Sequence, residues 1–518
     1  MKGSIGSKMK NLKIMKQSVL LKILLSTVFV FFAFELSLKM IGESISTIAP
    51  SWNDEAFYYS QVKSVLAYGH SLGYYGYNYS HSNIGGFGFH GMFILIPYWL
   101  MGKIIGLDLN TIAITNIVLI IICFAVFICL FNPTIKQYLL LFVSLFSGYF
   151  FFLSVTEMVD TTNYFYALLI SFFFLKMINC DGKNKKKETI YRILLATCIT
   201  IACLSKPVFV AFWLPFVLVF FCRGKQVWKC GITGLFVSIL ATLIMSVLFY
   251  VIFAQFSSPY FTSQIDSVKA VFLTQGIWNG LVHWLRLFLV NARLMITDGL
   301  FGDNYTIVIP SWVELVTIIV SIGVCIRYKF ANYAWVPSLV ILEFLIGSNM
   351  LYAGGGFSIR TAYPAIVFAT SFVVNMYYEK MHVISKRLFV VAFTTFCICT
   401  LYCYASNQFD ARSYNSDKLI EETKYVESEL SRVIILDANT DNPWENTIAQ
   451  YGAGAFASCV EWYAYPAGVG INLIMPGCLN NSSKYVMISE SEVELSYDVE
   501  NLGYKYLKTI HGYMYYTR

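Results

Sequence analysis

Long apolar runs dominate this sequence. With 57% hydrophobic and only 13% charged residues, the chain has roughly half the charged fraction of a soluble globular domain. The runs are about twenty residues long, which is the length that crosses a bilayer as a helix. The sequence therefore predicts an α-helical multi-pass membrane protein. The runs cover residues 19–41, 89–106, 111–131, 136–155, 161–178, 189–205, 207–222, 231–254, 311–326, 333–351, 362–378 and 388–405.

The first run predicts the orientation of the chain. It follows several lysines, extends from Val19 to Ile41 and lacks a cleavage site of small residues. A run of this length is too long for the core of a signal peptide, so we expect a retained anchor with the N-terminus in the cytoplasm. Asp54, which follows the run, then lies on the outer side of the membrane.

Basic clusters indicate which runs cross. If every run crossed, the lysine cluster at 183–187 would lie outside, against the positive-inside rule. The run 89–106 contains a proline, a glycine and a lysine and barely reaches spanning length. We expect it to be an outer interfacial or re-entrant helix, which leaves about eleven spans. The same argument makes 277–297 an outer amphipathic segment.

The net charge and the positions of the cysteines argue against two kinds of function, nucleic-acid binding and a Cys/His metal site. The net charge of +7 comes from short basic clusters between apolar runs, a pattern of membrane orientation, so we expect no nucleic-acid partner. Of the 13 cysteines, all but Cys459 and Cys478 lie in or beside apolar runs, where a thiol behaves as a small hydrophobe. The spacing matches no Cys/His metal motif.

The composition becomes polar after Tyr404. We therefore predict a transmembrane domain over 1–405, with a first outer loop at 42–110, and an extracytoplasmic C-terminal α/β domain over 406–518. In that outer compartment Cys459 and Cys478 either form a disulfide or remain two buried thiols. The expected elements of the second domain are a helix at Asp417–Arg432, strands at Val433–Leu436 and Tyr485–Ile488, and a hairpin at Gly503–Tyr516.

The stretch from Ser51 to Tyr59 is the first candidate functional site. Its Asp54 and Glu55 lie among aromatic residues at the mouth of a membrane segment, where carboxylates are costly and therefore indicate function. The alternative is a solvated acidic pair in an interfacial loop. The predicted topology brings further polar residues to the same outer side: Glu157, Asp160, Lys206 and Arg360.

These motifs resemble the GT-C membrane glycosyltransferases, in particular the branch of protein O-mannosyltransferases and aminoarabinose transferases. The resemblance covers roughly residues 17–405 and rests on the order and sidedness of short motifs, with the tail outside it. In this family a His-Pro-Pro stretch often opens the second juxtamembrane segment, whereas this chain has His90 without the prolines. The matching pieces are Asp54-Glu55, Thr156 to Asp160, Lys206-Pro207 and Arg360-Thr361-Ala362-Tyr363-Pro364.

The resemblance implies a sugar donor linked to a polyprenyl phosphate and an acceptor hydroxyl on a glycan, lipid or protein. Because the leaving phosphate is already anionic, one base suffices and no general acid is required. We expect Asp54 to be this base, with Glu55 the second candidate. Lys206 and Arg360 would bind the donor phosphate. A divalent ion on Asp160 or Glu157 with His90 is an optional addition.

Two other functions remain open. A lipid-linked sugar or polysaccharide transporter would place ionisable residues along a path through the bundle, but mid-span ones are sparse, chiefly Glu35 and Glu343. A polysaccharide polymerase or ligase would use a lipid-linked oligosaccharide, and it would be favoured by the outer arginines Arg286 and Arg293.

Overall fold

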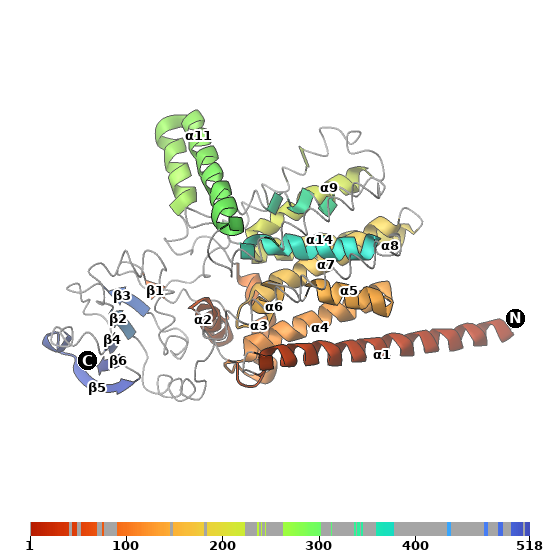
Figure 1. Cartoon of the computed structure of the whole chain (residues 1–518), viewed down its shortest axis with the longest axis horizontal. Helices are drawn as coiled ribbons and strands as arrows, with labels where there is room; N and C mark the ends of the chain where they lie inside the picture. Colours follow the sequence, from red (N-terminus) through yellow and green to blue (C-terminus); the bar gives the residue numbers. More distant parts are fainter. Residues whose placement is uncertain are drawn as a thin grey trace.

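The computed structural model shows a helical bundle with a small β-sheet beyond one end of it (Figure 1). It describes residues 2–40, 44–48, 53–69, 75–76, 91–145, 149–180, 184–222, 263–301, 359–377, 433–436, 471–474, 485–489, 499–510 and 513–517, with isolated helical residues between 236 and 344.

Four described helices are long and apolar enough to cross a membrane, which confirms an integral, multi-pass protein. They are α1 (Lys2–Met40), α4 (Thr111–Phe131), α7 (Asp160–Cys180) and α8 (Lys185–Ser205). Shorter helices join the bundle: α5 (Ile135–Leu145), α6 (Tyr149–Ser154), α9 (Trp213–Cys222) and α14 (Ile359–Tyr377). The count of eleven spans stays a prediction, because the runs 231–254, 311–326, 333–351 and 388–405 lie wholly or mostly outside the described residues.

Local sequence sets the helix boundaries. At the end of α4, Asn132 adopts the left-handed conformation with φ 45° and ψ 56°, as asparagine often does at a helix end, and the Pro133 that follows cannot continue the helix. The side chain of Asn184 accepts a hydrogen bond from Lys187 N at 3.1 Å and caps the start of α8.

Contacts between the helices establish their relative directions. Lys22 of α1 bonds to Asn132 after α4, while Asn110 before α4 bonds to Ile45 O, so these two helices are antiparallel. By contrast, α7 and α14 are parallel, because Tyr164 contacts Tyr363 and, further along, the hydroxyls of Ser171 and Ser371 are 3.0 Å apart. We call the end where α4, α7 and α14 begin the site end, and the other the far end.

Two short helices lie at the site end: α2 (Asn53–Tyr68) and α3 (Ile96–Ile105), the latter preceded by η1 (Met92–Leu95). They pack closely, since a Cβ on Gly102 of α3 would lie 2.7 Å from Leu66 Cδ1 of α2. At 10 residues, α3 has only about half the length a span requires. Because α9 (Trp213–Cys222) is equally short and lies in a run that we expect to cross, the prediction that the run 89–106 does not cross stays a prediction.

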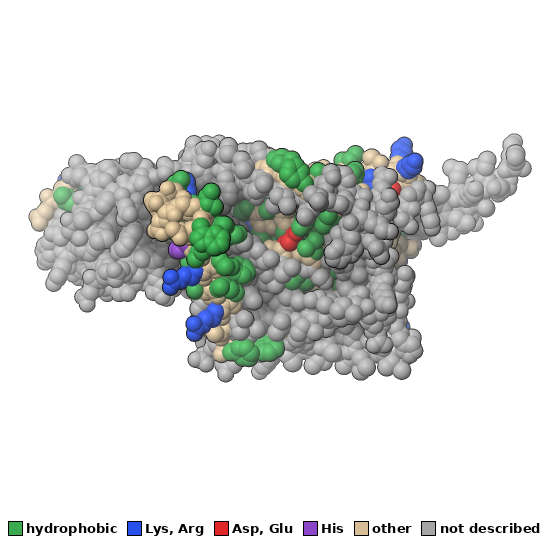
Figure 2. Space-filling model, turned by 90° about the horizontal axis from the view of Figure 1, so that it is seen from above, with side chains coloured by type: hydrophobic (Ala, Val, Ile, Leu, Met, Phe, Trp, Pro, Cys, Tyr) green, Lys and Arg blue, Asp and Glu red, His purple; other side chains and the backbone are tan. Residues whose placement is uncertain are grey.

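Helix α11 (Ser263–Phe301) consists of two helices joined at Gly276, whose φ of 84° favours glycine, and stands off the bundle in Figure 1. It is not among the described helices that are apolar enough to span; the outer amphipathic segment at 277–297 stays a prediction. Large apolar residues near the bend, Leu273, Ile277 and Trp278, are exposed. Figure 2 shows hydrophobic, basic and histidine side chains together on this surface.

The sheet has six strands in the order β1-β3-β2-β4-β6-β5. Two predicted strands are confirmed as β2 and β4, and β5 with β6 forms the predicted antiparallel hairpin. The strands are β1 (Tyr75–Gly76), β2 (Val433–Leu436), β3 (Ile471–Ile474), β4 (Tyr485–Ser489), β5 (Lys505–Ile510) and β6 (Tyr513–Thr517).

One strand of this sheet comes from the first outer loop. Tyr75 of β1 pairs in parallel with Ile471 of β3, so the loop 42–110 and the C-terminal segment contribute to a single sheet. The domain boundary at 405/406 stays a prediction. The predicted helix Asp417–Arg432 and both Cys459 and Cys478 lie outside the described residues.

Candidate functional site

The acidic pair of the first outer loop lies in the first turn of α2. Acidic residues are favourable there because of the positive end of the helix dipole. Glu55 is only 1% exposed, and Tyr58 and Val62, one and two turns later, are fully buried. The side chain of Asp54 lies outside the described residues; its position in the helix puts it about 100° around the axis from Glu55.

Glu55 is connected to the loop between α6 and α7. Its Oε1 accepts a hydrogen bond from Glu157 N at 2.9 Å. The carboxylate of Glu157 in turn accepts hydrogen bonds from Ile112 N at 3.2 Å and Ala113 N at 3.1 Å, at the beginning of α4. These amides belong to the first turn of a helix, which has no internal acceptors for them. Glu157 therefore connects the loop between α6 and α7 to the start of α4. Glu55 connects α2 to the same loop.

Asp160 and Lys206 form a buried pair of opposite charges. Asp160 begins α7 and is 0% exposed, and Lys206 is 4% exposed. Their Oδ1 and Nζ atoms are 4.0 Å apart, which is electrostatic contact at more than hydrogen-bond distance. Lys206 has φ −151° and ψ 127°, the extended conformation expected of a residue before proline. The Lys206-Pro207 sequence thus ends α8 and places the lysine at the site end.

Arg360 also lies at this end of the bundle. It is the second residue of α14, and its side chain is outside the described part of the chain. One turn later, the ring of Tyr363 meets Tyr164 edge-on with centroids 5.4 Å apart, and Tyr164 is one turn beyond Asp160. Residue 360 therefore lies at the same end of the bundle as Asp160. Residues 54, 206 and 360 thus all lie at the site end of the bundle.

His90 itself lies outside the described residues. The next residue, Gly91, donates a backbone hydrogen bond to Ser205 O at 2.9 Å. Ser205 immediately precedes Lys206. The second outer segment therefore meets the end of α8 directly beside the buried lysine.

Asn116 was not predicted from the sequence, although it organises this region. It is fully buried in α4, and its Nδ2 donates to Thr156 O at 2.9 Å and to Met158 O at 2.8 Å. Its Oδ1 accepts a hydrogen bond from Tyr98 Oη at 2.7 Å. Burial raises the pKa of Tyr98 well above its usual value, so this hydroxyl stays protonated as a donor. A polar residue inside an apolar run was the available signal.

Two further buried amides border the site. Asn163 is 0% exposed, one turn after Asp160, and neither atom of its amide has a hydrogen-bond partner among the described residues. Gln61 of α2 is 1% exposed, and its Nε2 likewise has none in the described part of the structure. Gln61 follows Asp54 by seven residues, or about two helical turns, so the two share one stripe of α2. Buried polar groups ordinarily have partners, so these amides are candidates for contacts with a polar ligand.

The described residues contain no group of three His, Cys, Asp or Glu side chains placed to hold a metal ion. Both carboxylate oxygens of Glu157 accept backbone amides, and Asp160 faces the ammonium of Lys206. These described acids do not form a metal site by themselves. A divalent ion held by Asp160 or Glu157 together with His90 stays a prediction.

Sequence comparisons find no protein-family model and no curated protein that matches this chain. Solved structures do match. ArnT from Cupriavidus metallidurans bound to undecaprenyl phosphate aligns with a TM-score of 0.52 and 10% identity, over 95% of this chain and 97% of that one. The apo structure of the same protein gives a TM-score of 0.53.

A second match is the archaeal oligosaccharyltransferase AglB from Archaeoglobus fulgidus, in complex with an inhibitory peptide and a dolichol-phosphate. It has a TM-score of 0.50 and 13% identity, over 98% of this chain and 74% of that one. Both are GT-C fold membrane glycosyltransferases. The resemblance seen in the sequence motifs is therefore confirmed at the level of the fold: the chain is a multi-pass membrane protein with a GT-C-like architecture.

Proposed function

We propose that this protein is a glycosyltransferase that moves a sugar from a polyprenyl-phosphate-linked donor to a hydroxyl group at the outer face of the membrane. The acceptor belongs to a cell-surface glycan, lipid or protein. The observation that carries the proposal is the GT-C-like fold over nearly the whole chain, with acidic and basic residues together at one end of it.

The ligands of the compared proteins support the donor class. ArnT was solved with undecaprenyl phosphate and AglB with a dolichol-phosphate. Both compounds are polyprenyl phosphates, which place an anionic group at the surface of the bilayer. A buried cation at a helix end could receive such a group, and Lys206 is a buried cation between α8 and η2 (Pro207–Phe212).

In the proposed reaction, the carboxylate of Asp54 accepts the proton of the acceptor hydroxyl. The oxygen of that hydroxyl forms a bond to the anomeric carbon while the bond from that carbon to the phosphate oxygen breaks. The electron pair of the broken bond leaves with the polyprenyl phosphate, and Lys206 and Arg360 stabilise the developing negative charge. Glu55 holds the base-bearing helix against the loop at Glu157, which favours a positioning role for it.

The amides of Asn163 and Gln61 support a polar ligand at this end. A sugar offers several hydroxyls that both donate and accept, which matches the amide of Asn163 and the Nε2 of Gln61, neither of which has a hydrogen-bond partner among the described residues. Because Gln61 shares a stripe of α2 with Asp54, a sugar bound there would lie on the same face of the helix as the proposed base, about 10 Å along its axis.

The direct test is Asp54→Asn in proteoliposomes that contain polyprenyl-phosphate donor with a labelled sugar. Transfer of label to an envelope extract should fall by about 10² to 10⁴-fold, the usual contribution of a positioned base. Asp108→Asn is the matched control, since Asp108 is an exposed carboxylate of the same outer loop and should leave transfer unchanged. Transfer at the wild-type rate by a folded Asp54→Asn protein would remove Asp54 as the base.

One alternative has an observation in its favour. The likeness to an oligosaccharyltransferase favours a ligase that transfers a preassembled oligosaccharide. Supplying donors that carry one sugar or several distinguishes the two enzymes, because only a ligase would prefer the longer donor. Movement of intact donor between leaflets without any transfer would instead establish a transporter.

A further inference from the structure

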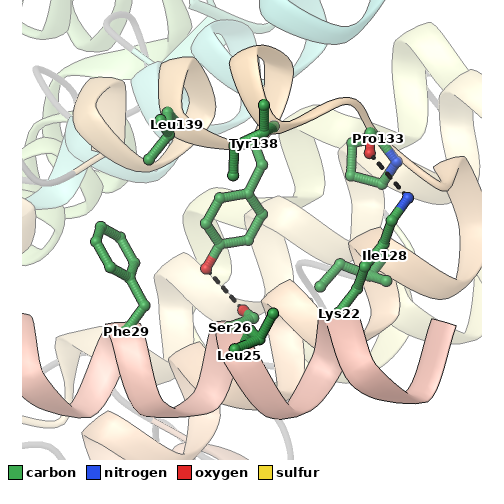
Figure 3. Close-up of a pocket in the computed structure, with 9 residues that line it drawn as sticks. Lys22, Leu25, Ser26, Phe29, Ile128, Pro133, Tyr138 and Leu139 are labelled. Carbon is green, nitrogen blue, oxygen red and sulfur yellow. Dashed lines mark hydrogen bonds between the residues drawn. The ribbon is translucent and has the colours of Figure 1, made fainter. Parts of the chain in front are cut away.

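A groove at the far end of the bundle is separate from the candidate functional site. It lies where α1 packs against the end of α4 and the beginning of α5, and its volume is about 330 Å³, at the lower end of the range for ligand sites. Figure 3 shows its walls. They are formed by Lys22, Leu25, Ser26, Phe29, Ile128, Pro133, Ile135, Tyr138 and Leu139.

The walls of the groove are apolar. Leu25 is 60% exposed, Ile135 is 69% exposed and Leu139 is 39% exposed, so the groove opens toward the surroundings of the bundle. The two hydroxyls in it, Ser26 Oγ and Tyr138 Oη, are hydrogen-bonded to each other at 2.7 Å. They satisfy one another inside the wall, and a hydrocarbon chain could lie over them without leaving a polar group unpaired.

One end of the groove carries a positive charge. Lys22 Nζ donates to Asn132 Oδ1 at 2.6 Å and to Pro133 O at 3.3 Å. Both acceptors are neutral oxygens, and among the described residues no carboxylate forms an ion pair with this lysine. Two neutral oxygens therefore orient its charge, and no carboxylate in the described part of the chain neutralises it. Lys136, beside Ile135 in the sequence, is a second exposed cation at this end.

The depth of Lys22 points to an anionic lipid. The apolar stretch of α1 begins at Val19, so Lys22 lies about one turn inside it. A cation at this level is unfavourable unless it reaches the headgroup region or meets an anion. Basic pockets between membrane helices characteristically bind anionic headgroups.

We propose that this groove binds an anionic phospholipid of the adjacent leaflet, which the positive-inside pattern predicts to be the cytoplasmic one. The phosphate group contacts Lys22, and one acyl chain lies along Leu25, Phe29 and Leu139. This lipid holds α1, a helix with few buried residues, against α4 and α5. The charge of Lys22 selects an anionic headgroup over a zwitterionic one.

The test measures lipid retained by the purified full-length protein. Protein in mixed micelles of phosphatidylglycerol and phosphatidylcholine is analysed by native mass spectrometry, and the wild type should retain phosphatidylglycerol preferentially. Lys22→Gln should lower that retention about fivefold, the effect of losing roughly 1 kcal/mol of attraction per lysine. Lys39→Gln is the matched control: Lys39 is an exposed lysine near the other end of α1 that pairs with Glu35 at 3.7 Å, so its loss should leave retention unchanged.

A second variant tests the acyl-chain contact. Leu139→Trp fills the groove while leaving the charge of Lys22 in place, and it should lower retention of phosphatidylglycerol by a similar factor. Equal retention of both lipids by the wild type, or no effect of Lys22→Gln, would overturn the proposal. Displacement of phosphatidylglycerol by an equimolar amount of undecaprenyl phosphate would also overturn it and assign the groove to a polyprenyl lipid.

Discussion

Helices α1 and α7 have spanning segments of equal length but opposite surroundings. Each has a 21-residue segment that could cross a membrane, yet 61% of the apolar window of α7 is buried and only 17% of that of α1. The buried helix is the more polar one: Asp160, Thr162 and Asn163 are all 0% exposed. The exposed helix presents Leu20 and Leu24, at 69% and 59% exposure.

This difference in burial between α1 and α7 follows from the lipid that surrounds a membrane protein. Lipid tails are as apolar as leucine, so a membrane protein gains little by burying its hydrophobic residues. Polar side chains, in contrast, must face the protein interior and find partners there. In this chain the polar first turn of α7 therefore marks the candidate site, whereas the more apolar α1 forms an outer surface. The apolar segment of α1, Val19–Lys39, contains one cation ahead of its last turn. That cation is Lys22, beside which we place a bound lipid.

The largest expected effect on stability comes from breaking the buried pair of Asp160, at the start of α7, and Lys206, at the end of α8. Lys206→Met removes the described cation that faces the buried Asp160, which should destabilise the protein by about 3 to 5 kcal/mol. Thermal unfolding of the purified protein in detergent measures the change. Adding Asp160→Asn to Lys206→Met should restore much of the stability without restoring sugar transfer, because the proposed phosphate ligand is still missing. A double variant as unstable as the single one would show that the pair does not behave as a unit.

The next largest effect concerns Asn116. Asn116→Ala leaves Thr156 O and Met158 O without their described donor, and each unsatisfied buried group costs about 1 to 3 kcal/mol. We expect a loss of roughly 3 kcal/mol and weaker protection of residues 155–159 in hydrogen exchange. Asn279→Ala is the control, because Asn279 is exposed on α11 and bonds only locally, to Gln275 O at 3.0 Å.

The smallest effects compare leucines of the two helices directly. Leu168 of α7 is 1% exposed and Leu24 of α1 is 59% exposed. Leu168→Ala opens a cavity and should cost about 2 kcal/mol, whereas Leu24→Ala exchanges one lipid contact for another and should cost less than about 0.5 kcal/mol. The same detergent unfolding assay applies. Equal losses at the two positions would contradict the assignment of α1 as a lipid-facing helix.

Several elements follow from short-range sequence alone. The lengths of the apolar runs predict the spans, and the Lys206-Pro207 dipeptide predicts the end of α8, because proline restricts the residue before it. The strands at 433–436 and 485–488 and the hairpin after Gly503 were also predicted, since short continuous apolar runs and turn residues are local signals. The basic clusters predicted that 89–106 does not cross and that residues 54, 206 and 360 share one end.

The tertiary structure decided what each polar residue of that end contacts. The sequence shows Glu55 and Glu157 alike as glutamates of the outer side. In the structure, Glu157 accepts hydrogen bonds from backbone amides at the start of α4, and Glu55 accepts one from the backbone amide of Glu157 itself. The pairing of Tyr75 with Ile471 likewise joins segments with no local relation. Hydropathy and spacing report on neighbours within a few residues, whereas hydrogen bonds and ion pairs between distant segments exist only once the helices have packed.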